Sequence, residues 1–269
     1  MFSVKSLFGA AVAAIISTAA FAADLPQPAP VYQPVVAPEP CCGGAWYLRG
    51  EVGVGIMNRT KFIFEQNPLN SSNFTIQHNS IADTTIFGAG VGYEFNNWFR
   101  ADVTAEYRTK AAVNAYGLYN LNGGTFGDVY TGSVRSLVVL ANGYIDLGTW
   151  NCLTPFIGAG VGFASNQLND LVDTGLGTSG SGFGTNPTHT NVAWALHAGL
   201  SYAVTQNFTV ELAYRYLNYG SVTASINCIG GCNPDSYKVD HLNSNDLMFG
   251  MRWRFPPAAG VAVPLSTRG

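Results

Sequence analysis

Histidine and serine side chains that lie close together can form part of a hydrolase site, and His241 and Ser244 are the pair that invites this comparison here. Residues three apart point to opposite faces of a β-strand, and no carboxylate is clearly placed to orient the histidine, although Asp240 and Asp246 are close. His197 is better explained as a polar residue of the protein interior. We therefore expect no catalytic residues and no enzymatic activity, and keep a lipid-active hydrolase as an alternative.

Two cysteines, Cys228 and Cys232, lie four residues apart in a segment that also contains Gly230 and Gly231. In an oxidising compartment this spacing favours a local disulfide with the glycines in its turn. A zinc site is the alternative, but His241 is the only other soft ligand nearby. We expect the disulfide, and no metal.

We expect the other three cysteines on the periplasmic side of the barrel. Cys41 and Cys42 precede its first strand, and Cys152 lies in a short connection between strands. A bridge from one of the pair to Cys152 is a further hypothesis.

An identical Gly-Ala-Gly-Val-Gly sequence occurs at residues 88–92 and 158–162 and superficially resembles a dinucleotide-binding loop. Such a loop must open a helix so that its amide groups point at the phosphate, whereas both copies lie within alternating, strand-like sequence. We therefore expect no bound cofactor, and attribute the repetition to a repeated hairpin.

The composition excludes several classes of protein. The chain is 47% hydrophobic and 13% aromatic but only 11% charged, against about 25% charged in average soluble domains. After the first 22 residues it has no apolar run of the roughly 20 residues that a transmembrane helix needs. A formal net charge of −3 gives no reason to expect nucleic acid as a partner.

The folded region contains eight runs of alternating residues, each long enough for a tilted transmembrane strand. They are residues 46–58, 84–95, 99–111, 130–147, 154–164, 191–204, 208–218 and 246–255. Short connections alternate strictly with long ones rich in Gly, Asn, Ser and Thr. This pattern predicts an all-β fold, an eight-stranded antiparallel transmembrane β-barrel in an up-and-down meander, with four long extracellular loops and three short periplasmic turns.

The two faces of these strands differ in charge. One is nearly free of charged residues, as in Phe87, Val91 and Phe95. The other carries equal numbers of basic and acidic residues: Arg49, Glu51, Glu94, Arg100, Asp102, Glu106, Arg108, Lys110, Asp146, Glu211, Arg215, Asp246, Arg252 and Arg254. Only Arg135 has the wrong parity within a strand. Because eight strands enclose a space that side chains can fill, we expect the charged face to form an interior ion-pair network that largely closes the barrel.

Alternation alone does not decide which face is inside, since a soluble lipocalin-like ligand binder would enclose the apolar one. Aromatic residues at the ends that meet the short turns, among them Trp46, Trp98, Trp150 and Trp253, favour an interfacial girdle and hence a membrane. A small porin-like channel is the main alternative function, and would need a less tightly filled interior.

The chain divides into four segments. Residues 1–22 carry a basic residue, an apolar stretch and a small-x-small ending at Ala20 and Ala22, which predicts a signal peptide and a mature chain that begins at Ala23. Residues 23–45 are rich in proline and predict a periplasmic tether. Residues 46–255 form the barrel, and residues 256–269 a short periplasmic tail.

Several of these sequences together resemble the OmpA-like eight-stranded barrels, and particularly the surface-antigen outer-membrane proteins of alphaproteobacteria. The likeness rests on AFAADLP (20–26), WYLRGEVG (46–53), RADVTAEYR (100–108), NGYIDLG (142–148), LTPFIGAGVG (153–162) and RWRF (252–255). The resemblance implies a bacterial outer-membrane protein with a structural, antigen or adhesion role and no cofactor. Its partners would be outer-membrane lipid and lipopolysaccharide, the outer-membrane insertion machinery, and extracellular surfaces that contact its loops.

The resemblance also assigns a role to Phe255, since barrels of this kind end on an aromatic residue that the insertion machinery recognises. Here Phe255 is followed by Pro256, Pro257 and twelve further residues. This departure puts the insertion signal in question. The tail is too short for a peptidoglycan-binding domain, so that function is not carried over.

Overall fold

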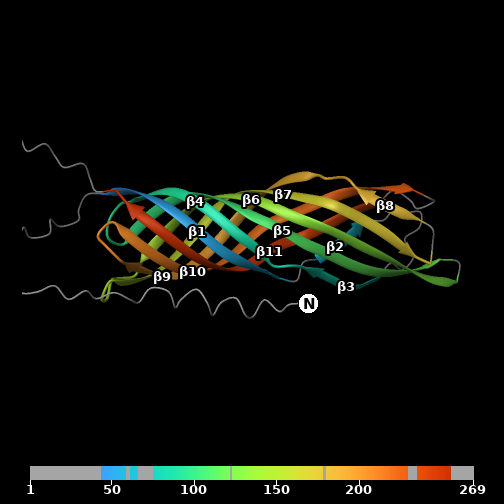
Figure 1. Cartoon of the computed structure of the whole chain (residues 1–269), viewed down its shortest axis with the longest axis horizontal. Coiled ribbons are helices and arrows are strands. Elements are labelled where there is room, and N and C mark those ends of the chain that lie inside the picture. The colour runs from blue at the N-terminus through green and yellow to red at the C-terminus, as the bar shows by residue number, and fades with distance from the viewer. Residues whose placement is uncertain are drawn as a thin grey trace, which may run out of the picture. The chain divides into compact units, whose positions relative to one another are not determined.

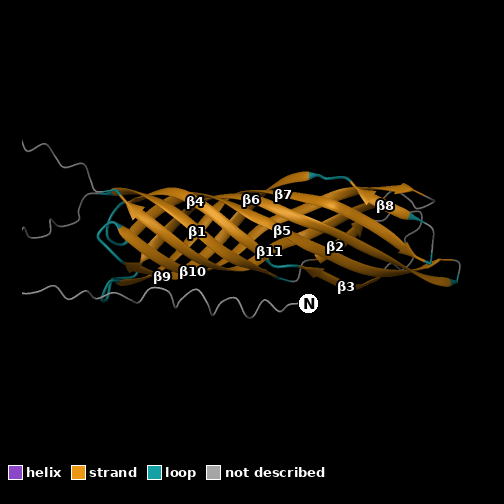
Figure 2. Ribbon diagram, in the orientation of Figure 1, coloured by secondary structure: helices purple, strands orange, loops and turns teal. Residues whose placement is uncertain are grey.

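The structure is a computed structural model that describes residues 44–58, 61–65, 75–121, 123–177, 180–229 and 235–255. Its regular secondary structure consists of β-strands (Figure 2). No helix in the described part of the chain has the length and apolar character needed to cross a membrane.

Eight long strands wind round a closed barrel, tilted against its long axis (Figure 1). They are β1 (Ala45–Met57), β4 (Thr84–Glu94), β5 (Phe99–Leu121), β6 (Gly124–Asp146), β7 (Leu153–Leu176), β9 (Thr188–Ala203), β10 (Phe208–Ile229) and β11 (Asp235–Arg254). Each pairs antiparallel with the next, and β11 closes the ring on β1, where Val52 lies opposite Phe249. The predicted fold class, with its eight-stranded meander, is confirmed.

The three short turns lie at one end of the barrel, which we call the short-turn end. Asn96 fixes the first of them, because its Oδ1 accepts hydrogen bonds from the backbone N–H groups of Trp98 and Phe99 at 3.0 and 2.8 Å. Thr205 acts in the same way in the third turn, where its Oγ1 accepts from Phe208 N at 3.0 Å. Side chains that bond their own backbone a few residues on are typical of tight turns.

The opposite end, which we call the extended end, differs from the loops that the sequence led us to expect. Strands β5 and β6 continue as a hairpin until Leu121 pairs with Gly124, and β7, β10 and β11 also run well past their predicted ends. Three short strands complete this end: β2 (Lys61–Glu65) pairs with β11, β3 (Thr75–Ile81) pairs with β5, and β8 (Ser181–Gly184) lies between β7 and β10 (Figure 1). The predicted boundaries at residues 111, 164, 218 and 246 were therefore wrong.

β-Bulges explain why these continuations were missed. The pairing of β5 with β6 shifts between Arg108 and Ala111, and the pairing of β6 with β7 shifts where Asp170 takes a positive φ of 56°. A bulge inserts one extra residue and so exchanges the inward and outward positions that follow it. On β5 the buried positions are even-numbered up to Arg108 and odd-numbered from Ala111 onward.

The interior of the barrel has two levels. Towards the short-turn end it holds charged side chains, which are buried, while the apolar face points outward and is exposed. Towards the extended end it is filled by a buried apolar cluster: Val113, Ala115, Tyr130, Val134, Val138, Leu140, Ala164, Leu168, Leu171, Ala193, Ala195, Leu217, Tyr219, Val222, Ala224, Ile226, Tyr237, Val239 and Leu242. This second core was not anticipated from the sequence.

Candidate functional site: the charged interior

Arg215 is buried in the charged interior, where it borders the apolar cluster. Its Nη1 and Nη2 donate to Oε1 and Oε2 of Glu106 at 2.7 and 2.6 Å, and its Nε and Nη2 donate to Oδ2 of Asp246 at 3.0 and 2.8 Å. Arg108 binds the same aspartate through both of its Nη atoms at 2.9 Å, and also donates to Ser244 Oγ at 2.7 Å. These forked contacts use the planar guanidinium at its best geometry.

A second group surrounds Arg49, closer to the short-turn end. Its Nε lies 3.0 Å from Glu51 Oε2, its Nη1 3.3 Å from Asp102 Oδ2, and its Nη2 3.5 Å from Glu211 Oε2. The same Nη1 donates to the Tyr144 hydroxyl at 2.9 Å. One guanidinium therefore faces three carboxylates, and all four charged groups are buried.

Arg100, on β5, joins this group through Glu211, which lies on the opposite strand β10. Its Nη2 lies 3.4 Å from Glu211 Oε1 and its Nε 3.3 Å from Asp146 Oδ1. Its guanidinium carbon also lies over the rings of Tyr144 and Phe156, at 4.3 and 4.7 Å from their centroids. Such cation–π contacts compensate a buried cation further.

The charges at the short-turn end are more accessible. Glu94 receives both Arg252, at 3.4 Å, and Arg254, at 3.2 Å, and Arg254 also donates to the Gln206 carbonyl at 2.8 Å. Exposure rises from 2% for the Arg215 side chain to 36% for that of Arg254. The interior therefore passes from a dry centre to a wet rim.

Neutral residues that the sequence analysis did not single out complete the site. Asn142 Nδ2 donates to Asp102 Oδ1 at 2.8 Å, the Tyr47 hydroxyl donates to Asp102 Oδ2 at 3.1 Å, and Ser201 Oγ donates to Glu211 Oε1 at 3.0 Å. They share the inward parity of the charged residues. That parity was the signal that could have found them.

Small residues make this arrangement possible. A Cβ atom added at Gly88 would lie 2.9 Å from the Glu51 side chain, and one added at Gly55 would clash with the Arg108 guanidinium. Both glycines face inward beside long charged side chains. Their lack of a side chain provides the space that the ion pairs occupy.

The prediction that Lys110 belongs to the interior network is wrong. Lys110 points outward, with 54% of its side chain exposed, and pairs with Asp170 at 3.2 Å. The cause is the bulge after Arg108, which places Lys110 on the outer wall instead of the inner one.

The hydrolase residues do not come together. His241 has a positive φ of 55°, is exposed, and pairs with Asp240 at 2.9 Å, whereas Ser244 is buried inside against Arg108. His197 is buried beside the Tyr144 ring, at 5.3 Å between centroids. Among the residues that the structure describes, no group of His, Cys, Asp and Glu could hold a metal ion.

Most of the cysteines lie outside the description. Cys41, Cys42 and Cys232 fall outside the described residues, as do Ala20, Ala22 and Ala23, and nothing is described of the Cys228 side chain. Cys152 is exposed and forms no disulfide with a described residue, and its bridge to Cys41 or Cys42 also stays a prediction. The Cys228–Cys232 disulfide stays a prediction.

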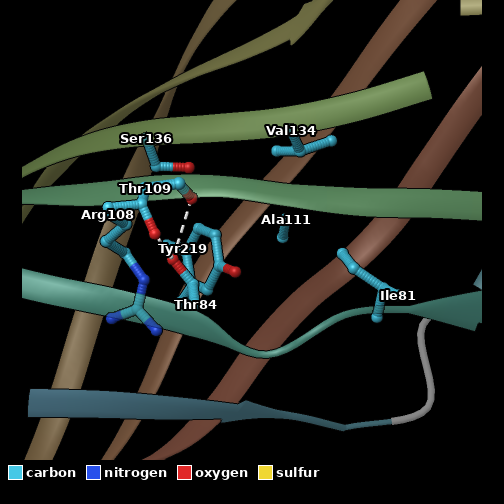
Figure 3. Close-up of a pocket in the computed structure, with 8 residues that line it drawn as sticks. All are labelled: Ile81, Thr84, Arg108, Thr109, Ala111, Val134, Ser136 and Tyr219. Carbon is cyan, nitrogen blue, oxygen red and sulfur yellow. Dashed lines mark hydrogen bonds between the residues drawn. The ribbon is translucent and has the colours of Figure 1, made fainter. Parts of the chain in front are cut away.

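A small pocket marks the junction of the two interior levels (Figure 3). Its lining combines charged and polar groups with apolar ones: Ile81, Thr84, Arg108, Thr109, Ala111, Val134, Ser136 and Tyr219. Thr84 Oγ1 donates to the Thr109 carbonyl at 2.8 Å across it. The space holds about one water molecule, which is too little for a substrate.

Comparison with known proteins decides the family. The model of the outer membrane protein beta-barrel domain matches residues 8–255. The chain belongs to the outer membrane protein beta-barrel family. In this family's setting, the bacterial outer membrane, the exposed apolar wall faces lipid, the short-turn end is periplasmic and the extended end is extracellular.

Relatives and a solved structure agree with this assignment. The chain is 32% identical to the outer membrane protein PagN of Salmonella typhimurium, over 78% of this chain and 89% of PagN. It is 30% identical to an uncharacterized protein of Brucella abortus (88% and 93% covered), and 29% identical to a Rickettsia conorii protein named as a candidate adhesin (77% and 81% covered). The crystal structure of the outer membrane protein OprG from Pseudomonas aeruginosa shares the fold, with a TM-score of 0.53 and 16% identity over 80% of this chain and 97% of OprG.

The family assignment explains the aromatic residues at the periplasmic end. Trp46, Trp98, Trp150, Trp253 and Phe255 are all exposed on the outer wall or in the turns. Aromatic side chains of this kind sit at the membrane–water interface of outer-membrane barrels. They fix the level at which the barrel enters the bilayer.

Proposed function

We propose that this outer-membrane barrel is a non-enzymatic surface protein of the adhesion type, in which the membrane-embedded half is an anchor and the extracellular half presents a binding surface. The proposal rests on the length of the strands. Strand β5 has 23 residues, whereas crossing the bilayer takes about 9–11 tilted residues. The remainder would project roughly 25–30 Å beyond the hydrocarbon.

The extracellular half is built as a solid support. Its interior is the apolar cluster described above, in which Tyr130 and Tyr237 stack at 5.5 Å between ring centroids. Burial raises the pKa of the Tyr237 phenol, so this ring stays neutral at any physiological pH. A packed core of this kind holds the surface strands in fixed positions.

Apolar side chains are exposed on the outside of this support, far from lipid. Leu176 of β7, Phe183 of β8 and Ile229 of β10 lie on three adjacent strands, and Ile229 is 66% exposed. Exposed apolar groups that neither lipid nor protein covers often mark an interaction site. The candidate-adhesin name of the Rickettsia relative supports the same role.

A cell-binding assay tests this function. Escherichia coli cells that display the wild-type chain should bind cultured host cells above an empty-vector strain. A variant with Leu176→Ser, Phe183→Ser and Ile229→Ser should lose most of that binding while remaining heat-modifiable in the outer membrane. A matched variant on the lipid-facing wall, Leu196→Ala, should keep it. Equal binding by the empty-vector strain would refute the proposal.

We also propose that residues 1–22 are a signal peptide, residues 23–45 a tether whose last residue, Ala45, already begins β1, and residues 256–269 a periplasmic tail. The apolar stretch with its small-x-small ending supports the signal peptide, and the proline-rich composition supports the tether. Amino-terminal sequencing of the mature protein should begin at Ala23. A chain that retains Met1 would contradict it.

A further inference from the structure

Arg135 is an exception among the arginines of the described strands, because its side chain lies on the outer wall of the barrel. It belongs to β6 and pairs in register with Gln167 of β7. Its Nε donates to Gln167 Oε1 at 2.7 Å. Within the described part of the chain its Nη atoms form no further hydrogen bond or ion pair, so both can bind a ligand.

The outer wall changes character at this arginine. On the membrane side of it, Leu137 of β6, Tyr107 of β5 and Phe163 of β7 are all exposed to lipid. On the extracellular side, the outward positions of the same strands carry polar residues such as Thr131 and Asn114. Since charge on the lipid face costs about 2–4 kcal/mol at the midplane and little at the interface, Arg135 marks the level of the outer-leaflet headgroups.

Lys110 lies at the same level. The bulge in β5 places Thr109 and Lys110 opposite Arg135, between the pairs Arg108–Ser136 and Ala111–Val134. The strand therefore uses an extra residue to bring an exposed lysine next to the only outward arginine of the described strands. Two cations on neighbouring strands form a basic pair, which we define as Lys110 and Arg135.

The acidic groups nearby do not cancel this pair. Asp170 of β7 contacts Lys110 at 3.2 Å, with 71% of its side chain exposed, and accepts no contact from Arg135. Asp83, before β4, directs its Oδ1 to the backbone N–H of Met57 at 3.1 Å, on the β1 side. One cation is thus partly neutralised and the other is open.

We propose that Lys110 and Arg135 form a binding site for a phosphate group of lipopolysaccharide in the outer leaflet. A guanidinium binds phosphate oxygens in a forked geometry, and an adjacent ammonium adds a second charge-assisted contact. The apolar wall formed by Leu137, Tyr107 and Phe163 continues directly below, where the acyl chains of the same lipid would lie. Head and tail recognition together select a lipid over a free anion.

Thermal unfolding in nanodiscs tests this site. Barrels are placed in phosphatidylcholine nanodiscs, purified lipopolysaccharide is titrated in, and the unfolding midpoint is followed. For the wild type the midpoint should rise, whereas Lys110→Gln/Arg135→Gln should require roughly 30-fold more lipopolysaccharide for the same shift. Lys238→Gln, which removes a cation from the extracellular half, is the matched control and should behave as the wild type.

Asp170→Asn gives the opposite expectation. It frees Lys110, and asparagine tolerates the positive φ at this position, so less lipopolysaccharide should be needed. Should the double variant fail to assemble, Arg135→Gln and Asp170→Asn still move the titration in opposite directions. Dephosphorylated lipopolysaccharide and inorganic phosphate should each give no shift. An unchanged titration for the double variant, or an equal shift with either of these two probes, overturns the site.

Discussion

Arg215 and Glu106 form a bidentate ion pair across the full width of the barrel, with N–O distances of 2.7 and 2.6 Å. They belong to β10 and β5, which are separated by three strands in either direction round the ring. Arg100 and Glu211 connect the same two strands in the opposite sense, cation on β5 and anion on β10. These contacts tie opposite walls together through the centre.

Removing one partner of this ion pair should lower the free energy of unfolding more than removing both partners. Arg215→Met leaves Glu106 charged and buried, and should lower the free energy of unfolding by about 3–5 kcal/mol. Glu106→Leu/Arg215→Met should lower it by less, because Arg108 still binds Asp246 through two hydrogen bonds. Urea unfolding of the reconstituted barrel measures both.

The exposed pair of Lys110 and Asp170 is the control. In detergent without lipopolysaccharide, Lys110→Met should lower the free energy of unfolding by no more than about 1 kcal/mol. If the double variant at Glu106 and Arg215 were less stable than Arg215→Met alone, the ion pair would be a net source of stability.

Ion conduction should be absent for two independent reasons. The ion pairs fill the membrane-embedded interior, and beyond them Leu168, Leu171 and Val239 fill the extracellular interior. We expect neither the wild type nor Glu106→Leu/Arg215→Met to give stable current steps in a planar bilayer, because the apolar cluster still blocks the second variant. Large, long-lived steps from the wild type would favour the porin-like alternative.

The membrane-spanning part of the fold could be predicted from the sequence because lipid imposes a strict rule on it. A charge on the outer wall is costly, so residues such as Arg49 and Glu51 on β1 and Glu211 on β10 all fall on one parity. Eight such runs and three short turns suffice to define a closed meander. The inward placement of all the predicted charged residues except Lys110 follows from the same rule.

The extracellular half could not be predicted in this way, because water tolerates polar residues on the outside and bulges interrupt the parity. On β5 the inward residues change from Glu106 and Arg108 to Val113 and Ala115. A single alternating pattern cannot be followed across that change, so the strand seemed to end at residue 111. The placement of Lys110 failed for the same reason.

The partners within the site could not be predicted either. Glu106 and Arg215 are 109 residues apart in the chain. Whether they meet depends on the tilt and stagger of the strands, which set the level of each residue along the barrel axis. Sequence parity shows only that both point inward.

We expect the extracellular half to open locally while the membrane-embedded half stays folded. Tyr237→Ala removes a fully buried ring that stacks on Tyr130, and a large buried aromatic typically contributes about 3–5 kcal/mol. We expect faster protease cleavage of the extracellular half on intact cells, with the heat-modifiable barrel retained. Phe183→Ala removes an exposed aromatic of the same half and should not change the cleavage rate. Loss of heat modifiability in Tyr237→Ala would show that the two halves fold as one unit.

The end of the last strand should still carry the insertion signal. Phe255 is exposed, and its backbone N–H donates to the Trp46 carbonyl at 2.9 Å, so it is held on the outer wall at the periplasmic rim although the chain continues beyond it. Phe255→Ala should reduce the heat-modifiable fraction in the outer membrane severalfold, and a chain that ends at Phe255 should assemble as well as the full chain. Phe249→Ala, on the same wall but away from the rim, is the matched control and should assemble normally. If the truncated chain assembles poorly while Phe255→Ala does not, the signal lies in residues 256–269 instead.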